Sequence, residues 1–541
     1  MPDRRVLREV ASAALTGLAV LVVWVVLVAP VELDDLTARA FVRLPLELLL
    51  VLAPALLPWP RVRTAAAVVV GLGVALLLLV KVLDLGFGAV FDRGFDPVGD
   101  WAYLGPGVGV LADSIGQTWA DVVAIGAALL ALAVLVVGPL AVVRLVRVAG
   151  RRPRVSLTAA TAFGALWVLL LATGIEALPG AGVASTSAAA FTIDEVRLVR
   201  ADLADHRRFA AEIRRDPYRE VPPAEALAGL RGKDVLVVFV ESYGRIAVQD
   251  SSFAPGVVAV LDAGTEQLAA AGYRTQSAFL TSPTYGAGSW LAHATLQSGL
   301  WVDSQRRYRQ LLGTDRLSLT ALFGQAGWRT VFDVPADTKD WPEGQAFYGF
   351  QDYYDSRNVG YRGPEFGYAP VPDQYTLAEL HRRELAPTQR RPVMAEVDLV
   401  SSHHPWTPLP PLLDWARVGD GSVFDGLPEQ GEQSSEVFRD PEAVKRVYGE
   451  SIQYSWRTLT SWLVAFPDPD RVLVVLGDHQ PHSYVSGQHA GHDVPVTVIT
   501  QDTAVMDRIS PWGWQDGLRP DPDATVWRMD AFRDRFLAAF D

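Results

Sequence analysis

Polar residues that can bind a metal or attack a substrate follow four apolar runs in the second half of this 541-residue chain. The runs are VLVVFV (235–240), RTQSAFL (274–280), PVMAEVDLV (392–400) and VLVVLG (472–477). The residues that follow them, directly or after a short loop, are Glu241, Ser289, His403 with His404, and Asp478 with His479. Two carboxylates, an imidazole and a hydroxyl that converge would bind a divalent cation. Their oxygen-rich chemistry suits manganese, magnesium or zinc.

Such convergence requires a fold that brings strand ends together. Two further runs, WRTVFDV (328–334) and VPVTVIT (494–500), are also apolar and of strand length. Continuous β-branched runs are typical of strands buried on both faces, and their alternation with helical segments predicts an α/β domain with a mostly parallel sheet. Because sites in such sheets form at the carboxyl ends of strands, we expect the residues after each run to share one crevice.

Several of these residues also have a plain structural interpretation. Ser289 lies between GAG and a helix-like segment, so it is either a nucleophile at a helix N-terminus or an ordinary N-cap. Arg245 could hold an anion or form a strand-end salt bridge, and His293 could face the crevice or the surface. A second ion could bind three loop histidines, which otherwise only surround the first ion: His482, His489 and His492.

The first part of the chain is membrane-like. Five segments are apolar enough to cross a bilayer, which takes about 20 residues each. They lie at approximately 10–30, 41–59, 64–86, 120–143 and 156–178. The first is not a cleavable signal peptide, because it is long and four more segments follow.

Arginines mark alternate ends of these segments. They precede the first segment (Arg4, Arg5, Arg8), separate the second from the third (Arg61, Arg63) and cluster between 144 and 154. The positive-inside rule places this side in the cytoplasm, and an odd number of crossings then puts everything after about residue 179 outside it. We therefore predict a multi-pass protein of the bacterial cell membrane with an extracytoplasmic catalytic domain.

The expected organisation has three parts. A transmembrane domain with five helices covers residues 1–178, a linker with an amphipathic helix covers 179–230, and an extracytoplasmic α/β domain covers 231–541. The net charge of −13 and the absence of a basic stripe exclude nucleic acid as a partner. The chain has no cysteine, which excludes disulfides, zinc–thiolate sites and thiol nucleophiles.

The motifs VESYG, YGAGSW, SSHHPW and GDHQPH, in this order behind five expected spans, resemble the lipoteichoic acid synthase-like (phosphoglycerol transferase-like) branch of the alkaline phosphatase/sulfatase superfamily. The likeness covers residues 231–500. It implies an alkaline phosphatase/sulfatase-like fold and one divalent metal, manganese foremost, with zinc or magnesium as alternatives. The implied metal ligands are Glu241, Ser289, Asp478 and His479.

The resemblance also implies roles in substrate binding, with some departures. His403 matches the histidine that binds the substrate phosphate, and Trp341 lies where the family has a tryptophan that grips glycerol phosphate. The nucleophile is Ser289 where the family has threonine, and position 343 is glutamate where the family has arginine. The run SWLAH lacks the proline and arginine that accompany formylglycine formation in true sulfatases, which disfavours sulfate-ester cleavage.

Three hypotheses of function follow. The first is a metal-dependent transferase that moves a phospho-alcohol group from a membrane lipid to an envelope glycan or lipid through a phosphoseryl intermediate at Ser289. In it, His403 acts as proton donor or phosphate ligand. The second is a phosphodiesterase, phosphatase or sulfuric-ester hydrolase at the same site. The third is a non-catalytic envelope-binding membrane protein.

Overall fold

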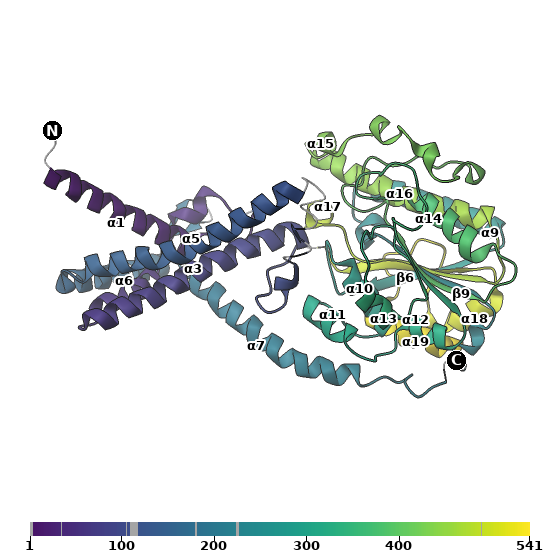
Figure 1. Cartoon of the computed structure of the whole chain (residues 1–541), viewed down its shortest axis with the longest axis horizontal. Helices are drawn as coiled ribbons and strands as arrows, with labels where there is room; N and C mark the ends of the chain where they lie inside the picture. The colour runs from purple at the N-terminus through teal and green to yellow at the C-terminus, as the bar shows by residue number, and fades with distance from the viewer. Residues whose placement is uncertain are drawn as a thin grey trace. The chain divides into compact units, whose positions relative to one another are not determined.

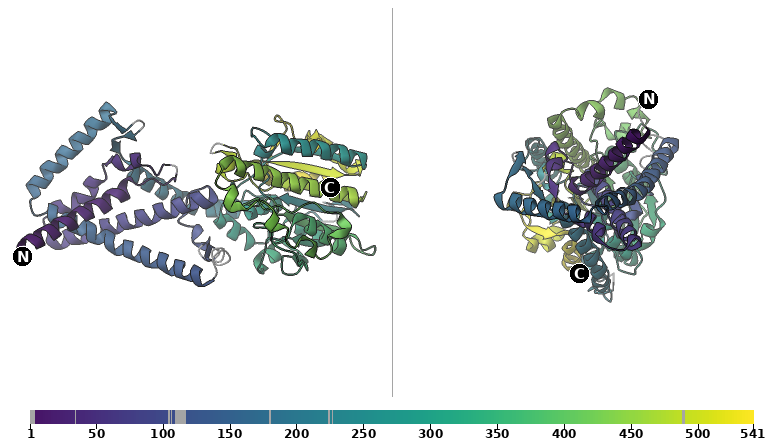
Figure 2. Two further views of the ribbon diagram at one scale, coloured as in Figure 1. Left: turned by 90° about the horizontal axis from the view of Figure 1, so that it is seen from above. Right: turned by 90° about the vertical axis from the view of Figure 1, so that its left-hand side faces the viewer.

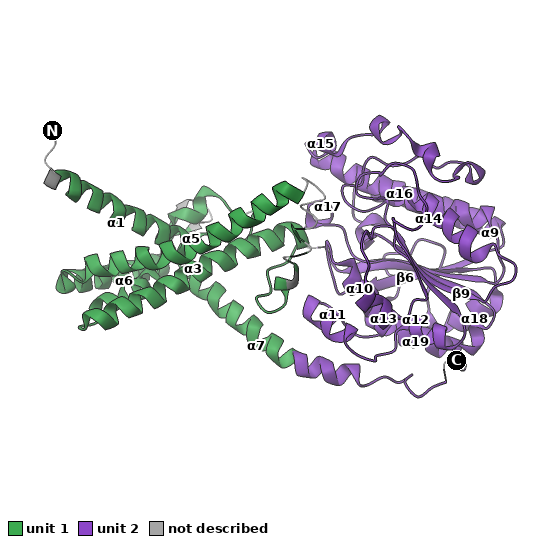
Figure 3. Ribbon diagram, viewed as in Figure 1, with its two compact units in different colours: residues 1–205 green, residues 206–541 purple. Residues whose placement is uncertain are grey.

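The computed structural model describes residues 4–541 except 34, 104, 106, 109–116, 179–180, 223–224, 226 and 488–489. The chain forms two compact units, Met1–Asp205 (unit 1) and His206–Asp541 (unit 2), which Figure 3 shows in separate colours. Helix α7 (Ser187–Ile213) begins in unit 1 and ends in unit 2, and it contains most of the predicted amphipathic helix 193–216.

Unit 1 is built from long apolar helices, seen from three directions in Figures 1 and 2. They are α1 (Arg4–Val28), α3 (Pro60–Phe91), α5 (Gln117–Ala149) and α6 (Pro153–Thr173). Within the described residues, these four helices are long and apolar enough to cross a membrane. The prediction of five spanning helices was therefore wrong by one.

The expected span at 41–59 forms no continuous helix. It consists of short pieces: η1 (Ala38–Val42), β1 (Leu44–Pro45), α2 (Leu48–Leu52) and η2 (Ala53–Leu56). Pro45, Pro54 and Pro58 each lack the backbone donor that a continuous helix requires. Glu47 is buried, and its Oε1 accepts a hydrogen bond from Ala189 N at 2.8 Å. Mean apolarity alone thus overestimated the helical character of this segment.

Side-chain contacts within unit 1 fix the direction of its helices. Arg144 Nε donates to Thr16 Oγ1 at 3.1 Å, which places the last part of α5 beside the first half of α1. Lys81 Nζ donates to Val26 O (3.1 Å) and Ala29 O (2.6 Å), which places the later part of α3 beside the end of α1. Helices α1 and α3 therefore run in the same direction, and segment 29–59 carries the chain back between them.

Unit 2 contains a nine-stranded sheet. Its strands are β5 (Asp234–Val240), β6 (Arg274–Thr281), β7 (Arg329–Asp333), β8 (Asp352–Tyr354), β9 (Val393–Leu399), β10 (Arg471–Gly477), β11 (Asp493–Thr500), β12 (Gln515–Asp516) and β13 (Val526–Arg528). The order is β12-β6-β11-β10-β5-β9-β7-β8, and β13 also pairs with β6. All six apolar runs identified in the sequence are strands of this sheet.

The sheet is mixed, so the prediction of a mostly parallel sheet was wrong. Strands β10, β5, β9, β7 and β8 are parallel to one another, but β11 is antiparallel to both β10 and β6. The chain turns back from Gly477 to Asp493 through a loop whose described residues form one short helix, α17 (Ser483–Ser486), which is too short for the crossover that a parallel return requires. Two antiparallel steps leave β6 parallel to β10.

Helices cover both faces of the sheet, as Figure 1 shows. One face packs against α9 (Ala254–Ala270), α14 (Asp373–Leu380) and α16 (Pro441–Ala465). The other packs against α10 (Ser289–Ser298), α12 (Leu319–Gln325), α18 (Thr503–Ile509) and α19 (Phe532–Phe540). Strand β5 is buried on both faces, which explains its unbroken apolar run, and each such aliphatic side chain stabilises the fold by roughly 1.5–3 kcal/mol.

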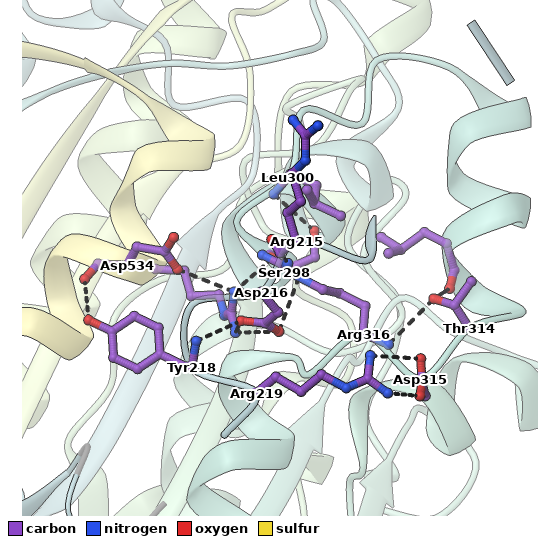
Figure 4. A network of polar contacts seen from close by, with 12 residues as sticks. Arg215, Asp216, Tyr218, Arg219, Ser298, Leu300, Thr314, Asp315, Arg316 and Asp534 are labelled. Carbon is purple, nitrogen blue, oxygen red and sulfur yellow. Dashed lines mark hydrogen bonds and ion pairs between the residues drawn. The ribbon is translucent and has the colours of Figure 1, made fainter. Parts of the chain in front are cut away.

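A buried polar network fixes the C-terminal end of α10 (Figure 4). Arg316 Nε and Arg533 Nη1 both donate to the carbonyl of Ser298, at 2.9 and 3.2 Å. Arg533 Nη2 also contacts both carboxylate oxygens of Asp216, at 2.9 and 3.1 Å. Cations at the C-terminus of a helix interact favourably with its dipole. The network therefore holds the helix whose first residue is Ser289.

Candidate metal centre

Four strand ends meet at one edge of the sheet. Because β5, β6, β9 and β10 run in the same direction, their carboxyl ends lie together. Glu241 follows β5, Asp478 and His479 follow β10, and Ser289 opens α10 after the loop that leaves β6. Glu241, Asp478 and His479 offer ligand atoms that all lie within 4.8 Å of one another.

The nucleophile candidate belongs to the same cluster. Ser289 Oγ lies 3.0 Å from Glu241 Oε2 and 3.3 Å from His479 Nε2. His479 Nε2 lies 3.5 Å from Glu241 Oε1 and 3.5 Å from Asp478 Oδ2. The structure thus brings together all four side chains that the resemblance implied as ligands.

Two glycines allow the ends of β5 and β10 to approach this closely. A Cβ added to Gly477 would lie 1.9 Å from the backbone oxygen of Tyr243, and one added to Gly244 would lie 1.9 Å from Gln480 Oε1. Ser242, between these turns, has a positive φ of 57°. Its backbone N–H donates to Asp478 Oδ1 at 2.7 Å. The strained turn therefore holds the aspartate in position.

The donor set fits a cation. Asp478 Oδ1 also accepts from its neighbour His479 N at 2.8 Å, whereas its Oδ2 is buried and has no hydrogen-bond partner among the described residues. His479 Nδ1–H donates to Gln480 O at 2.7 Å, so the lone pair of Nε2 faces the cluster. An unpartnered carboxylate oxygen and an oriented imidazole nitrogen are what a divalent metal requires.

Electrostatic repulsion within the cluster also favours a bound cation. Burial and the Glu241 carboxylate raise the pKa of Asp478 to about 6. Two carboxylates that face each other in a buried place stabilise a bound proton or a bound cation. A metal ion would relieve this repulsion.

Ser289 is not the N-cap of α10. That position belongs to Gly288, which has a φ of 88°. The loop before it also contains Gly286 with a φ of 72°. Ser289 is the first helical residue, and its hydroxyl contacts Glu241 and His479. Of the two interpretations of Ser289, the geometry favours the chemical one.

His403 lies on the loop after β9. Its ring stacks on Tyr368 at 3.8 Å, and its Nδ1–H donates to the carbonyl of His404 at 2.6 Å. Burial lowers the pKa of His403 to about 4, with a further contribution from His479. His403 is therefore neutral at pH 7 and offers the lone pair of Nε2.

The other predicted substrate-binding residues have structural partners. Arg245 Nη1 pairs with Asp493 Oδ2 at 3.0 Å, and its Nη2 donates to Pro522 O at 2.6 Å. Trp341 precedes α13 (Pro342–Tyr348) and packs against Phe332 and Tyr348. A role in substrate binding remains a prediction for both.

Sequence reasoning missed two acidic residues of β9, Glu396 and Asp398. They form a second group with His293 whose ligand atoms lie within 4.8 Å of one another. His293 is buried and faces the sheet, not the surface, since its ring stacks on Phe239 at 3.7 Å. Burial acts to lower the pKa of His293, but Asp398 and Glu396 outweigh it and raise the pKa to about 9. Two alternating acids in an otherwise apolar run were the available signal.

The structure describes two of the three loop histidines. The His482 ring packs against Tyr484 at 4.5 Å, and the His492 ring lies 5.5 Å from that of Tyr285. His489 lies outside the described residues. A second ion at these histidines remains untested.

Comparisons with known proteins give similarity at the level of structure. No family model and no curated protein match the chain. Among solved structures, the lipoteichoic acid synthase LtaP from Listeria monocytogenes is 15% identical with a TM-score of 0.33, over 50% of this chain and 67% of that chain. The C-terminal periplasmic domain of EcEptC from Escherichia coli in complex with Zn is 14% identical with a TM-score of 0.35, over 51% and 75%.

A third match is the Streptococcus pyogenes phosphoglycerol transferase GacH in complex with sn-glycerol-1-phosphate. It is 11% identical with a TM-score of 0.34, over 62% of this chain and 90% of that chain. These are proteins of the kind that the motifs resemble. At such identities and TM-scores, nothing about substrate, metal or reaction follows from the likeness.

Proposed function

We propose that the protein is a metal-dependent, membrane-anchored transferase that moves a phospho-alcohol group from a lipid to an acceptor in the cell envelope. The observation that carries this proposal is the position of the Ser289 hydroxyl, 3.0 Å from Glu241 and 3.3 Å from His479 beside the unpartnered oxygen of Asp478. This arrangement provides a nucleophile and the ligands that would activate it.

Glu241, Ser289, Asp478 and His479 would hold the metal, which when bound lowers the pKa of a coordinated hydroxyl and offsets negative charge on phosphate oxygens. The mixed oxygen and nitrogen donors suit manganese, zinc or magnesium. Ser289 also stands at the N-terminus of a ten-residue helix. The N-terminus of a helix favours an anionic group such as a phosphate.

The reaction has two halves. Ser289 Oγ loses its proton and forms a bond to phosphorus, the bond from phosphorus to the lipid alcohol breaks, and the alcohol leaves with that proton. An acceptor hydroxyl then attacks the phosphoseryl group, and the bond between phosphorus and Ser289 Oγ breaks. The neutral ring of His403 can accept a hydrogen bond from the acceptor hydroxyl at Nε2, and the proton of that hydroxyl passes to Ser289 Oγ as its bond to phosphorus breaks.

Unit 1 supports a membrane donor and an external acceptor. Its four candidate spans are long and apolar enough to anchor the chain in a bilayer. The basic ends of α1, α3 and α5 lie together, which the positive-inside rule assigns to the cytoplasm. Ser187, where α7 begins, contacts the carbonyl of Leu27 near the other end of α1 at 3.4 Å. The chain therefore leaves unit 1 at the end that is not cytoplasmic.

The purified full-length protein, loaded with manganese or zinc, tests the proposal when incubated with phosphatidylglycerol or phosphatidylethanolamine. Intact-mass and peptide analysis should reveal a phosphoglycerol or phosphoethanolamine adduct on Ser289 together with released diacylglycerol. Ser289→Ala is the matched control and should give neither. Adduct formation without an acceptor, followed by rapid release of the free phospho-alcohol, would instead identify a phosphodiesterase. Lack of any adduct and of any product would remove the enzymatic proposal.

A further inference from the structure

A second group of potential ligands lies between α10 and β9. His293 Nδ1 lies 2.9 Å from Glu396 Oε1 and 3.8 Å from Asp398 Oδ1. All three ligand atoms lie within 4.8 Å of one another. None of these residues belongs to the group formed by Glu241, Asp478 and His479. The two groups are linked through α10, since His293 lies one helical turn after Ser289.

The two carboxylates of this group are poorly compensated. Glu396 is 1% exposed, and Asp398 Oδ1 is buried without a hydrogen-bond partner in the described part of the chain. Among the described residues, the one cationic partner in an ion pair with either of them is His293. Buried carboxylates in proteins are paired with cationic groups or coordinate metals. One imidazolium beside these two carboxylates leaves a net negative charge when both carboxylates are ionised.

The side chains around the group hold its ligands in place. Gln297 Nε2 donates to Glu396 Oε2, and Gln297 Oε1 in turn accepts from Thr320 N at 3.0 Å and from Thr320 Oγ1 at 3.1 Å. Phe239 stacks on the His293 ring with an interplanar angle of 11°. Such outer contacts orient carboxylate and imidazole ligands in metal sites. Glu396 and His293 are therefore held in place before any ligand arrives.

We propose that His293 Nδ1, Glu396 and Asp398 form a second divalent-cation site, which takes zinc or manganese. Ligand bonds to zinc are about 2.0–2.2 Å long, so three atoms already within 4.8 Å of one another need only small shifts to share one ion. Binding displaces the proton of Nδ1. Three protein ligands leave at least one coordination position open, as in catalytic rather than structural sites.

A second cation would balance the negative charge near the substrate. This argument rests on the proposed function. Glu241, Asp478, Glu396 and Asp398 together carry up to four negative charges, and a phosphodiester adds another. One divalent cation offsets two of these charges. A second divalent cation offsets the rest of the carboxylate charge, so the anionic head group of a lipid meets no net repulsion.

Metal stoichiometry of the purified full-length protein tests the inference. The protein is equilibrated with manganese or zinc, unbound metal is removed, and metal per chain is measured by inductively coupled plasma mass spectrometry. We expect two ions in the wild type, one in Asp398→Asn, one in Glu241→Gln and none in the double variant. Asp333→Asn is the matched control, because Asp333 is another buried carboxylate with an unpartnered oxygen, and it should keep two ions.

The wild-type count decides the question even if a variant fails to fold. One ion in the wild type that is lost in Glu241→Gln would overturn the second site and leave the proposed function standing. The group of His293, Glu396 and Asp398 would then be a buried ion pair. Two ions in Asp398→Asn would overturn the assignment of ligands. No ion in the wild type would overturn both the second site and the proposed function.

Discussion

Ser289 Oγ lies 3.0 Å from Glu241 Oε2, although the two residues are 48 positions apart in the chain. The contact depends on strands β5 and β6, which end at the same edge without being neighbours in the sheet. It places a hydroxyl against a carboxylate where an imidazole and a second carboxylate also point.

Replacement of Ser289 by alanine should abolish group transfer, with a loss of about a thousand-fold or more, because it removes the hydroxyl that forms the proposed covalent intermediate. Ser289→Thr keeps a hydroxyl at the same position and should retain part of the activity. Turnover of labelled lipid by the purified variants is the measurement. Activity of Ser289→Ala close to that of the wild type would exclude this residue as nucleophile.

Gly477→Ala should disrupt the metal centre, because its Cβ would lie 1.9 Å from the backbone oxygen of Tyr243. Backbone atoms cannot move aside as a flexible side chain can, so β5 or β10 must shift. Metal content and thermal unfolding should both fall. Gly324→Ala is the control, because its Cβ would meet its nearest atom, in Thr330, at an ordinary 3.4 Å. Equal behaviour of the two variants would contradict this account.

Asp333 should make the stability of unit 2 depend on pH. Burial, together with Glu379 and Glu384 and against the effect of Arg383, raises the pKa of Asp333 to about 8. The folded protein therefore keeps this proton up to about pH 8, whereas the unfolded chain releases it near pH 4. The folded state binds more protons in this window, so its stability falls as the pH rises through it, by at most about 1.4 kcal/mol per pH unit.

Asp333→Asn removes this titration. The variant should match the wild type near pH 4 and become progressively more stable than it towards pH 8, as measured by urea unfolding at several pH values. Asp340→Asn is the control, since the Asp340 side chain is 88% exposed. A difference between Asp333→Asn and the wild type that is constant over the whole range would show that Asp333 does not titrate as described.

Asp216→Asn should destabilise unit 2 by up to about 3–5 kcal/mol, because it leaves the fully buried guanidinium of Arg533 with only the more exposed carboxylate of Asp534 as a counter-ion. Asp315→Asn provides the comparison in the same region, since it removes the exposed ion pair with Arg219 that Figure 4 also shows. We expect this second change to leave the melting temperature unchanged. Similar losses from both variants would refute the distinction between them.

A reporter enzyme that folds only outside the cytoplasm should be active when fused after residue 541. The same reporter inserted after Gly150, between α5 and α6, should be inactive, because the arginines of that turn belong to the cytoplasmic end. Activity measured in intact cells distinguishes the two positions. The reverse pattern would invert the proposed orientation of the protein.

The sequence predicted the elements that depend on local composition. Six apolar runs are strands, and the polar residues after β5, β6 and β10 meet, because the alternation of buried strands and helices determines which ends point to the same edge. The sequence did not predict the roles of residues whose partners lie far away along the chain. Glu47 has its partner at Ala189, and Arg245 has its partner 248 positions away at Asp493. No local pattern distinguishes such residues from a membrane-spanning or an anion-binding residue.

Strand direction and side-chain face were also beyond local reasoning. In the sequence, the connection from β10 to β11 is compatible with either strand orientation. Only the pairing of the two strands in the structure shows that β11 is antiparallel to β10. Glu396 and Asp398 alternate along β9, so they face the same side, but that side is recognisable as the one that carries His293 only once α10 is placed.

Arg533 couples helix α19 to the residue proposed as nucleophile. It touches the terminal carbonyl of α10 from a position 235 residues away, and Ser289 is the first residue of α10. A small molecule or an antibody that displaces α19 should therefore loosen Ser289 without approaching the candidate metal centre. Inhibition that is non-competitive with the lipid donor is the kinetic signature of such an agent.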